Sequence, residues 1–103
     1  MDQAMPSDDV MSLLRYEQPV LRQRFGVARL GVFGSVASGR TSSESDVDIV
    51  VEFDRPIGLE FVNLAEHLER ILGRNVDLIT PEGVASIRAP GVANSIMRSV
   101  VYV

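Results

Sequence analysis

The segment from residue 32 to residue 51 places the strongest constraint on how this chain can fold. It reads V-F-G-S-V-A-S-G-R-T-S-S-E-S-D-V-D-I-V-V, so two apolar strands enclose a Gly-Ser turn and a polar loop. Asp46 and Asp48 stand at the start of the second strand. Because alternate residues of a strand share a face, with α-carbons about 6.6 Å apart, both carboxylates can point at one place. The segment therefore predicts two strands joined by a turn, with an acidic site at one end.

The rest of the chain alternates between helical and extended patterns, which fits one domain over residues 1–103 with a frayed end at 1–6. We expect a helix over residues 7–25, kinked or restarted at Pro19, and strands over 27–33, 46–53 and 75–80. A short helical turn should follow Gly34, and further helices should cover 59–72, start near residue 80 and cover 92–99. The apolar residues 100–103 should dock on the core or meet a partner.

Residues 59–72 have the clearest amphipathic pattern in the chain. Their apolar side chains are predicted to form one stripe that packs into the core. This stripe consists of Leu59, Val62, Ala65, Leu68, Ile71 and Leu72. His67 falls among the charged residues of the opposite face, so we expect a surface histidine rather than a metal ligand or a base.

Composition excludes several classes of protein. The formal net charge of -4 argues against binding nucleic acid directly, which needs clustered cations. All ten cations are arginine, so a phosphate loop built on lysine is excluded. The chain has no cysteine, which removes disulfides and thiolate chemistry. No apolar run approaches about 18 residues, so we expect no membrane contact and a cytoplasmic protein.

The two carboxylates of Asp46 and Asp48 need a partner, because like charges on one strand face repel. A shared proton, an arginine or a divalent cation would resolve the repulsion, and oxygen ligands without thiolates favour Mg²⁺ or Mn²⁺. Asp77 lies on the next predicted strand and could aim at the same place if the two strands are neighbours. The alternative is that these acids are ordinary exposed strand residues.

The Gly-Ser turn can supply the anion-binding half of such a site. Gly34 permits close backbone approach, and Ser35 begins a helical turn whose free N–H groups favour an anion. A nucleoside triphosphate would fit between this turn and metal held by Asp46 and Asp48, with Arg40 either meeting further charge or remaining a solvated loop residue. Two metal ions could clamp the attacking and leaving oxygens, and Asp77 would bind one ion or accept a proton. The pattern predicts phosphoryl or nucleotidyl transfer.

These motifs, G-S-V-A-S-G-R with S-D-V-D-I-V-V-E-F and N-V-D-L-I-T, resemble the minimal nucleotidyltransferases of the DNA polymerase beta superfamily. The resemblance implies an α/β (α+β) fold, with a small three- to four-stranded mixed sheet flanked by helices, that binds ATP with Mg²⁺. It assigns Gly34 and Ser35 to the phosphate-binding turn and Asp46, Asp48 and Asp77 to the metal-binding, catalytic acids. Arg40 matches a frequent loop arginine of the family.

Many members of this family are similar to antitoxins that act on a HEPN-domain toxin. The resemblance implies a hetero-oligomer with such a toxin and transfer of AMP from ATP to one of its tyrosine hydroxyls. Two alternatives remain open. The domain could neutralise its partner by binding alone, or it could transfer a nucleotide to a small molecule or to RNA.

Overall fold

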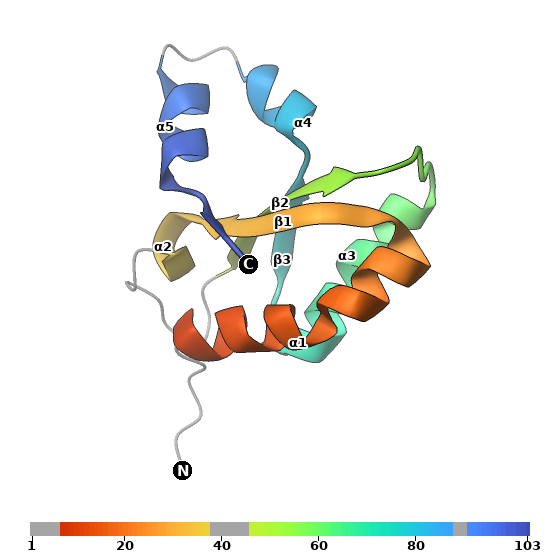
Figure 1. The fold of residues 1–103 in the computed structure, drawn as a ribbon. Coiled ribbons are helices and arrows are strands. Elements are labelled where there is room, and N and C mark those ends of the chain that lie inside the picture. The colour runs from red at the N-terminus through yellow and green to blue at the C-terminus, as the bar shows by residue number, and fades with distance from the viewer. Residues whose placement is uncertain (1–6, 38–45, 88–90) are drawn as a thin grey trace.

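A four-stranded sheet with helices on both sides organises the computed structural model, which describes residues 7–37, 46–87 and 91–103 (Figure 1). The expected mixed sheet flanked by helices is confirmed. Most predicted boundaries agree with the structure within one residue. In chain order the described elements are α1 (Ser7–Phe25), β1 (Val27–Phe33), α2 (Gly34–Ala37), β2 (Val47–Phe53), α3 (Glu60–Leu72), β3 (Val76–Ile79), α4 (Pro81–Ala85), α5 (Val92–Ser99) and β4 (Val101–Tyr102).

The strands lie in the order β3-β2-β1-β4. β1 is antiparallel to both of its neighbours, whereas β2 and β3 are parallel and α3 makes the crossover between them. Parallel strands need such a crossover because the chain must return to the same end of the sheet. The parallel pair brings the starts of β2 and β3, which carry the predicted acids, to the same edge of the sheet.

α1 and α3 cover one face of the sheet, and α4 and α5 lie on the other side (Figure 1). α1 continues through Pro19 as one helix, so the chain does not restart there. Buried residues on both sides of the proline, Leu14 and Leu21, hold the two parts of the helix against the same core. Burial on this scale can outweigh the loss of one backbone hydrogen bond at a proline.

The stripe predicted for α3 was partly wrong: its last residues are placed as expected, with Leu68 and Leu72 buried and Ile71 packed against the core, but its first residues are not. Leu64, Leu68 and Leu72 are buried, whereas Leu59 is 89% exposed and Val62 is 56% exposed. A step of three residues falls 60° short of a full helical turn, so a run of such steps from residue 59 to residue 71 winds around the helix. The buried residues follow steps of four instead.

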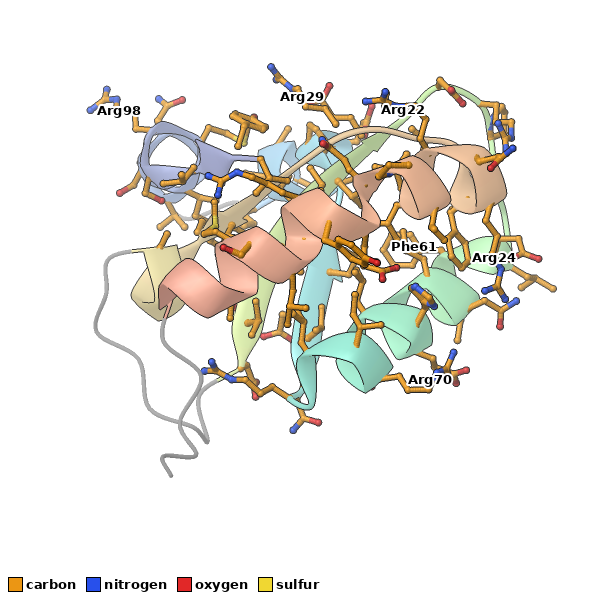
Figure 2. The ribbon with its side chains drawn as sticks, turned by 60° about the horizontal axis from the view of Figure 1, so that its bottom comes forward. Arg22, Arg24, Arg29, Phe61, Arg70 and Arg98 are labelled. Carbon is orange, nitrogen blue, oxygen red and sulfur yellow. The ribbon has the colours of Figure 1, made fainter. Side chains whose placement is uncertain are left out.

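His67 was also predicted incorrectly, because it is not a surface residue. Its side chain is 13% exposed and lies between α3 and α1, where Nε2 is 3.3 Å from Oε1 of Glu17. The ring of Phe25 lies 5.5 Å from the imidazole, centroid to centroid. Nearby, Phe61 lies where α1 and α3 run side by side (Figure 2) and makes an edge contact with Phe53. His67 therefore links the two helices.

The C-terminal residues dock on the sheet, which is one of the two outcomes expected for them. β4 pairs with β1, the backbone N–H of Val103 donates to the carbonyl of Leu30 at 3.1 Å, and Nε2 of Gln18 donates to the carbonyl of Val103 at 3.1 Å. The guanidinium carbon of Arg29 lies over the Tyr102 ring, 4.0 Å from the ring centroid. None of the helices in the described ranges is both long and apolar enough to cross a membrane.

Candidate active site

Asp48 and Asp77 lie side by side on neighbouring strands. In the parallel pairing of β2 with β3 these two residues are register partners, and Phe33 of β1 is the antiparallel partner of Asp48. Residues aligned across a sheet share a face, so Phe33, Asp48 and Asp77 form one row. The expectation that Asp77 lies on a strand next to the Asp-x-Asp pair is confirmed.

The environment of Asp48 disfavours its negative charge. Partial burial raises the pKa of the Asp48 carboxyl above its ordinary value, the charge and hydrogen-bonding contact of Asp77 raise the pKa further, and the charge of Asp46 adds to the effect. Asp46 and Asp77 themselves are exposed. A cation placed among the three carboxylates would favour their ionised forms.

The three aspartates fit a hard divalent cation in the chemistry of their donors, because carboxylate oxygens are the ligands that Mg²⁺ prefers. Among the described residues, however, no group of three or more acidic, histidine or cysteine side chains is already arranged to hold a metal ion. Asp48 and Asp77 form the converging pair. Asp46 precedes β2 and is exposed, so its side chain would have to turn toward the pair to complete a three-carboxylate site.

Gly34 brings the turn after β1 directly against Asp48. Its φ of +75° lies in the left-handed region, and a Cβ at this position would collide with Oδ2 of Asp48. Glycine is therefore required both by the backbone conformation and by the close approach. Of the other predicted phosphate-binding residues, Ser35 lies in α2 and Arg40 lies outside the described residues.

A cavity of about 390 Å³ opens beside the two aspartates. Apart from Asp48 and Asp77, the described residues that line it are apolar: Phe33, Leu78, Ile79, Ile87 and Ile96. Sequence reasoning missed these five. The only available signal was the pair of short helices after residue 80, whose apolar residues had no predicted role. A second cavity, of about 520 Å³, lies at the other end of β2 and contains none of the predicted site residues.

The fold and the acidic row at one sheet edge define a class of enzyme that transfers nucleotides, and the family comparison agrees. A family model described as a nucleotidyltransferase domain matches residues 18–103. The chain therefore belongs to the nucleotidyltransferase domain family and is a nucleotidyltransferase. The expected membership of the minimal nucleotidyltransferases is confirmed by the relatives and structures that it resembles.

Two curated relatives are similar over nearly their whole length. The protein adenylyltransferase MntA of Thermococcus cleftensis is 42% identical over 97 residues, which cover 93% of this chain and 94% of that protein. A proposed protein adenylyltransferase of Methanocaldococcus jannaschii is 41% identical over 98 residues, covering 92% of this chain and 95% of that protein.

Two solved structures share the fold. One is described as a proposed minimal nucleotidyltransferase; it has a TM-score of 0.68 and 32% identity, covering 89% of this chain and 93% of that one. The other is a toxin-antitoxin structure with AMP-PNP; it has a TM-score of 0.51 and 25% identity, covering 80% of this chain and 60% of that one.

Proposed function

We propose that this chain is a single nucleotidyltransferase domain that transfers AMP from ATP to a hydroxyl group of a partner protein. The observation that carries the proposal is the alignment of Asp48 with Asp77, with Gly34 packed directly against Asp48. This arrangement offers a place for a phosphate chain on one side of Asp48 and a place for an acceptor on the other. The relative named protein adenylyltransferase MntA supports AMP as the transferred group and a protein as the acceptor.

Each predicted site residue has a role in this proposal. Gly34 and Ser35 bind the triphosphate through the turn after β1, and Arg40 meets the remaining phosphate charge. Asp46, Asp48 and Asp77 hold Mg²⁺, which neutralises charge on the phosphates and on the attacking oxygen when it is bound. Burial raises the pKa of Asp48 most, and the charges of Asp77 and Asp46 raise it further. The contribution of these charges supports a cation site, because neighbouring carboxylates without a cation repel each other.

The transfer itself exchanges one bond for another. The acceptor oxygen forms a bond to the α-phosphorus of ATP, the bond from that phosphorus to the oxygen bridging the β-phosphate breaks, and pyrophosphate leaves. The proton of the acceptor hydroxyl passes to the carboxylate of Asp77 and then to solvent. Positioning and charge neutralisation supply most of the rate in reactions of this kind.

The partner is proposed to be a HEPN-domain toxin, which the chain binds in a hetero-oligomer in the cytoplasm and modifies on a tyrosine. The toxin-antitoxin structure with AMP-PNP, at 25% identity, supports a toxin as partner and a nucleotide as substrate. Modification and simple occlusion would both neutralise a toxin. The two therefore have to be separated by a variant that still folds and binds.

The decisive experiment compares Asp48→Asn with Asp54→Asn. Asp54 is exposed in the turn after β2 and provides a matched control for the same chemical change. Purified protein is incubated with α-labelled ATP, Mg²⁺ and the product of the adjacent gene. We expect label on the partner with the parent and with Asp54→Asn, and none with Asp48→Asn. If the parent leaves the partner unlabelled, or if Asp48→Asn protects cells from the partner as well as the parent does, the antitoxin does not act by transfer.

A further inference from the structure

The outer side of β4 is an open edge of the sheet. β4 is the terminal strand in the order β3-β2-β1-β4, so no other described strand pairs with its outer side. The N–H of Val103 donates to the carbonyl of Leu30 on β1, and the alternation of an antiparallel pair therefore turns the N–H of Tyr102 away from β1. Val101 is 45% exposed beside it. The edge thus presents an outward-facing backbone donor and an apolar side chain.

α1 brings two arginines to this edge. The side chain of Gln18 donates to the carbonyl of Val103, so the face of α1 that carries Gln18 lies against the end of β4. Arg15 and Arg22 stand three residues before and four residues after Gln18, which places them on the same face of the helix. Both arginines are exposed.

Two more arginines come from β1 and α5. The guanidinium group of Arg29 lies over the ring of Tyr102 on β4. Arg98 lies in the last turn of α5, directly before β4 begins. Figure 2 shows the side chains of Arg22, Arg29 and Arg98 pointing outward on one side of the molecule. We call the open side of β4 with its four arginines, Arg15, Arg22, Arg29 and Arg98, the arginine edge.

Most of the positive charge at the arginine edge has no counter-ion within the described part of the chain. Arg29 forms an ion pair with Glu52 at 2.9 Å. Arg15, Arg22 and Arg98 form no ion pair with another described residue. The chain as a whole has a formal net charge of -4, so this side has the opposite sign to the molecule. Such a surface attracts a negatively charged partner.

The arginine edge lies close to the acidic row without being part of it. Val101 pairs with Val32, the residue before Phe33, and Phe33 pairs with Asp48. Because β4 and β2 are both neighbours of β1, the two are separated by two strand spacings, about 10 Å. A protein bound at the edge would therefore lie beside the acidic row and leave the strands that carry it uncovered.

We propose that the arginine edge binds an acidic surface of the partner protein and so holds the acceptor hydroxyl near the acidic row. The proposal rests on the proposed function for the existence of this partner, and it adds where the partner docks. A guanidinium group can donate two parallel hydrogen bonds to one carboxylate, which makes arginine suited to bind acidic side chains. Val101 supplies an apolar contact between the charges, as the centre of a protein interface requires.

Other occupants fit the arginine edge less well. Single-stranded RNA binds to proteins through dense positive charge together with aromatic rings on which its bases stack. At this edge Arg29 is already paired with Glu52, and the ring of Tyr102 is already covered by Arg29. Two copies of this chain joined edge to edge would bring arginines against arginines. An acidic protein surface is therefore the occupant that the charges favour.

A pair of double variants tests the proposal by charge reversal. The first carries Arg22→Glu and Arg98→Glu, and the control carries Arg24→Glu and Arg70→Glu. Each double variant changes one arginine in the last turn of α1 and one in the last turn of a second helix, so net charge and helix-end effects change equally. Figure 2 shows Arg24 and Arg70 on a different side of the molecule from Arg22 and Arg98.

Binding to the product of the adjacent gene is measured by biolayer interferometry without ATP or Mg²⁺. The edge variant should have a Kd raised about tenfold, mainly through slower association, and the control should bind as the parent does. Added salt should weaken the parent more than the edge variant. An unchanged Kd in the edge variant, equal weakening in both double variants, or no binding by the parent would each refute the arginine edge as the docking surface.

Hydrogen exchange on the parent complex gives a test that needs no variant. The outward-facing N–H of Tyr102 should exchange more slowly when the partner is bound, whereas exchange along α3 should not change. Unaltered exchange at residues 101–103 would overturn the proposal. Fluorescence anisotropy with a single-stranded RNA oligonucleotide tests the other occupant. If the edge variant loses affinity for this RNA but not for the partner, the edge binds RNA and the proposal is wrong.

The docking surface and the proposed function fail in different ways. If the parent binds the partner through the arginine edge but transfers no AMP to it, the proposed function fails and the docking surface stands. If the parent transfers AMP to the partner, and the edge variant does so with the same KM for the partner, the proposed function stands and the docking surface is refuted.

Discussion

Replacement of Gly34 by alanine tests how closely the turn after β1 must approach Asp48. The structure provides a matched control in Gly73, which ends α3. Both glycines are left-handed, with φ of +75° and +66°, but a Cβ on Gly73 meets no atom within 4 Å, whereas a Cβ on Gly34 collides with the Asp48 carboxylate. The two variants therefore share the backbone strain and differ in the collision.

The expected magnitudes follow from that difference. A non-glycine residue in the left-handed region costs about 1–2 kcal/mol, so both variants should lose about that much free energy of unfolding. For a domain of this size each kcal/mol lowers Tm by about 4–8 °C. The collision in Gly34→Ala can be relieved by rotation of the Asp48 side chain, which adds little to unfolding but moves a proposed metal ligand by about 1 Å. Misplacement on that scale costs about a hundredfold in rate.

Two measurements separate the loss of stability from the loss of activity. Circular dichroism follows thermal unfolding, and AMP transfer from ATP is assayed at a temperature well below the unfolding transitions of both variants. Gly34→Ala and Gly73→Ala should unfold at similar temperatures, with transfer reduced about a hundredfold only in Gly34→Ala. Equal transfer rates in the two variants would show that the contact between the turn and Asp48 does not position the site. A far larger loss of stability in Gly34→Ala would show that the collision is relieved by displacement of the backbone and not by rotation of the Asp48 side chain.

Three further changes test the site and the packing behind it. The raised pKa of Asp48 means that ionisation of this carboxyl destabilises the metal-free fold. In EDTA, the parent should therefore lose stability relative to Asp48→Asn as the pH rises from the ordinary aspartate range through the raised pKa. Urea unfolding at several pH values measures this difference. His67→Ala should lower the free energy of unfolding by about 1–3 kcal/mol, because it removes packing and the contact with Glu17. Glu66 is exposed, so Glu66→Ala should have little effect in the same denaturation assay. Glu69→Ala should lower AMP transfer more than Glu66→Ala does, because Oε2 of Glu69 accepts the N–H of the residue before Asp77 at 3.1 Å.

Local patterns were enough to predict most of the secondary structure. Gly and Pro residues mark the ends of the elements, and apolar periodicity distinguishes the strands from the helices between them. The predicted strand over residues 27–33 and helix over 92–99 agree with β1 and α5 at both ends. The acids and Gly34 could be selected because their spacing along the chain is unusual. What these patterns contain is information about neighbours in sequence.

The parts that could not be predicted depend on neighbours in space. The predicted stripe of α3 was wrong at its N-terminal end, because the apolar pattern was wide enough to include Leu59 and Val62, and only the packing of the helix against the sheet decides which apolar residues are buried. His67 appeared polar by position, yet the approach of α1 encloses it beside Glu17. The apolar residues that line the cavity beside Asp48 and Asp77 come from four separate parts of the chain, so no single stretch of sequence indicates this cavity.

The pairing of Asp48 with Asp77 depends on a register that β3 alone could not maintain, because the strand has only four residues. A slip of one residue would turn Asp77 to the face covered by α1 and α3. Both ends of β3 are held against such a slip. At the first residue of the strand, the Glu69 carboxylate accepts the N–H of Val76, and just before it the carbonyl of Asn75 accepts the N–H of Val47. After the strand, Thr80 caps α4. We therefore expect contacts outside the acidic row to decide whether Asp77 reaches the proposed site, and we expect Glu69 to act as a positioning residue rather than as a solvated surface residue.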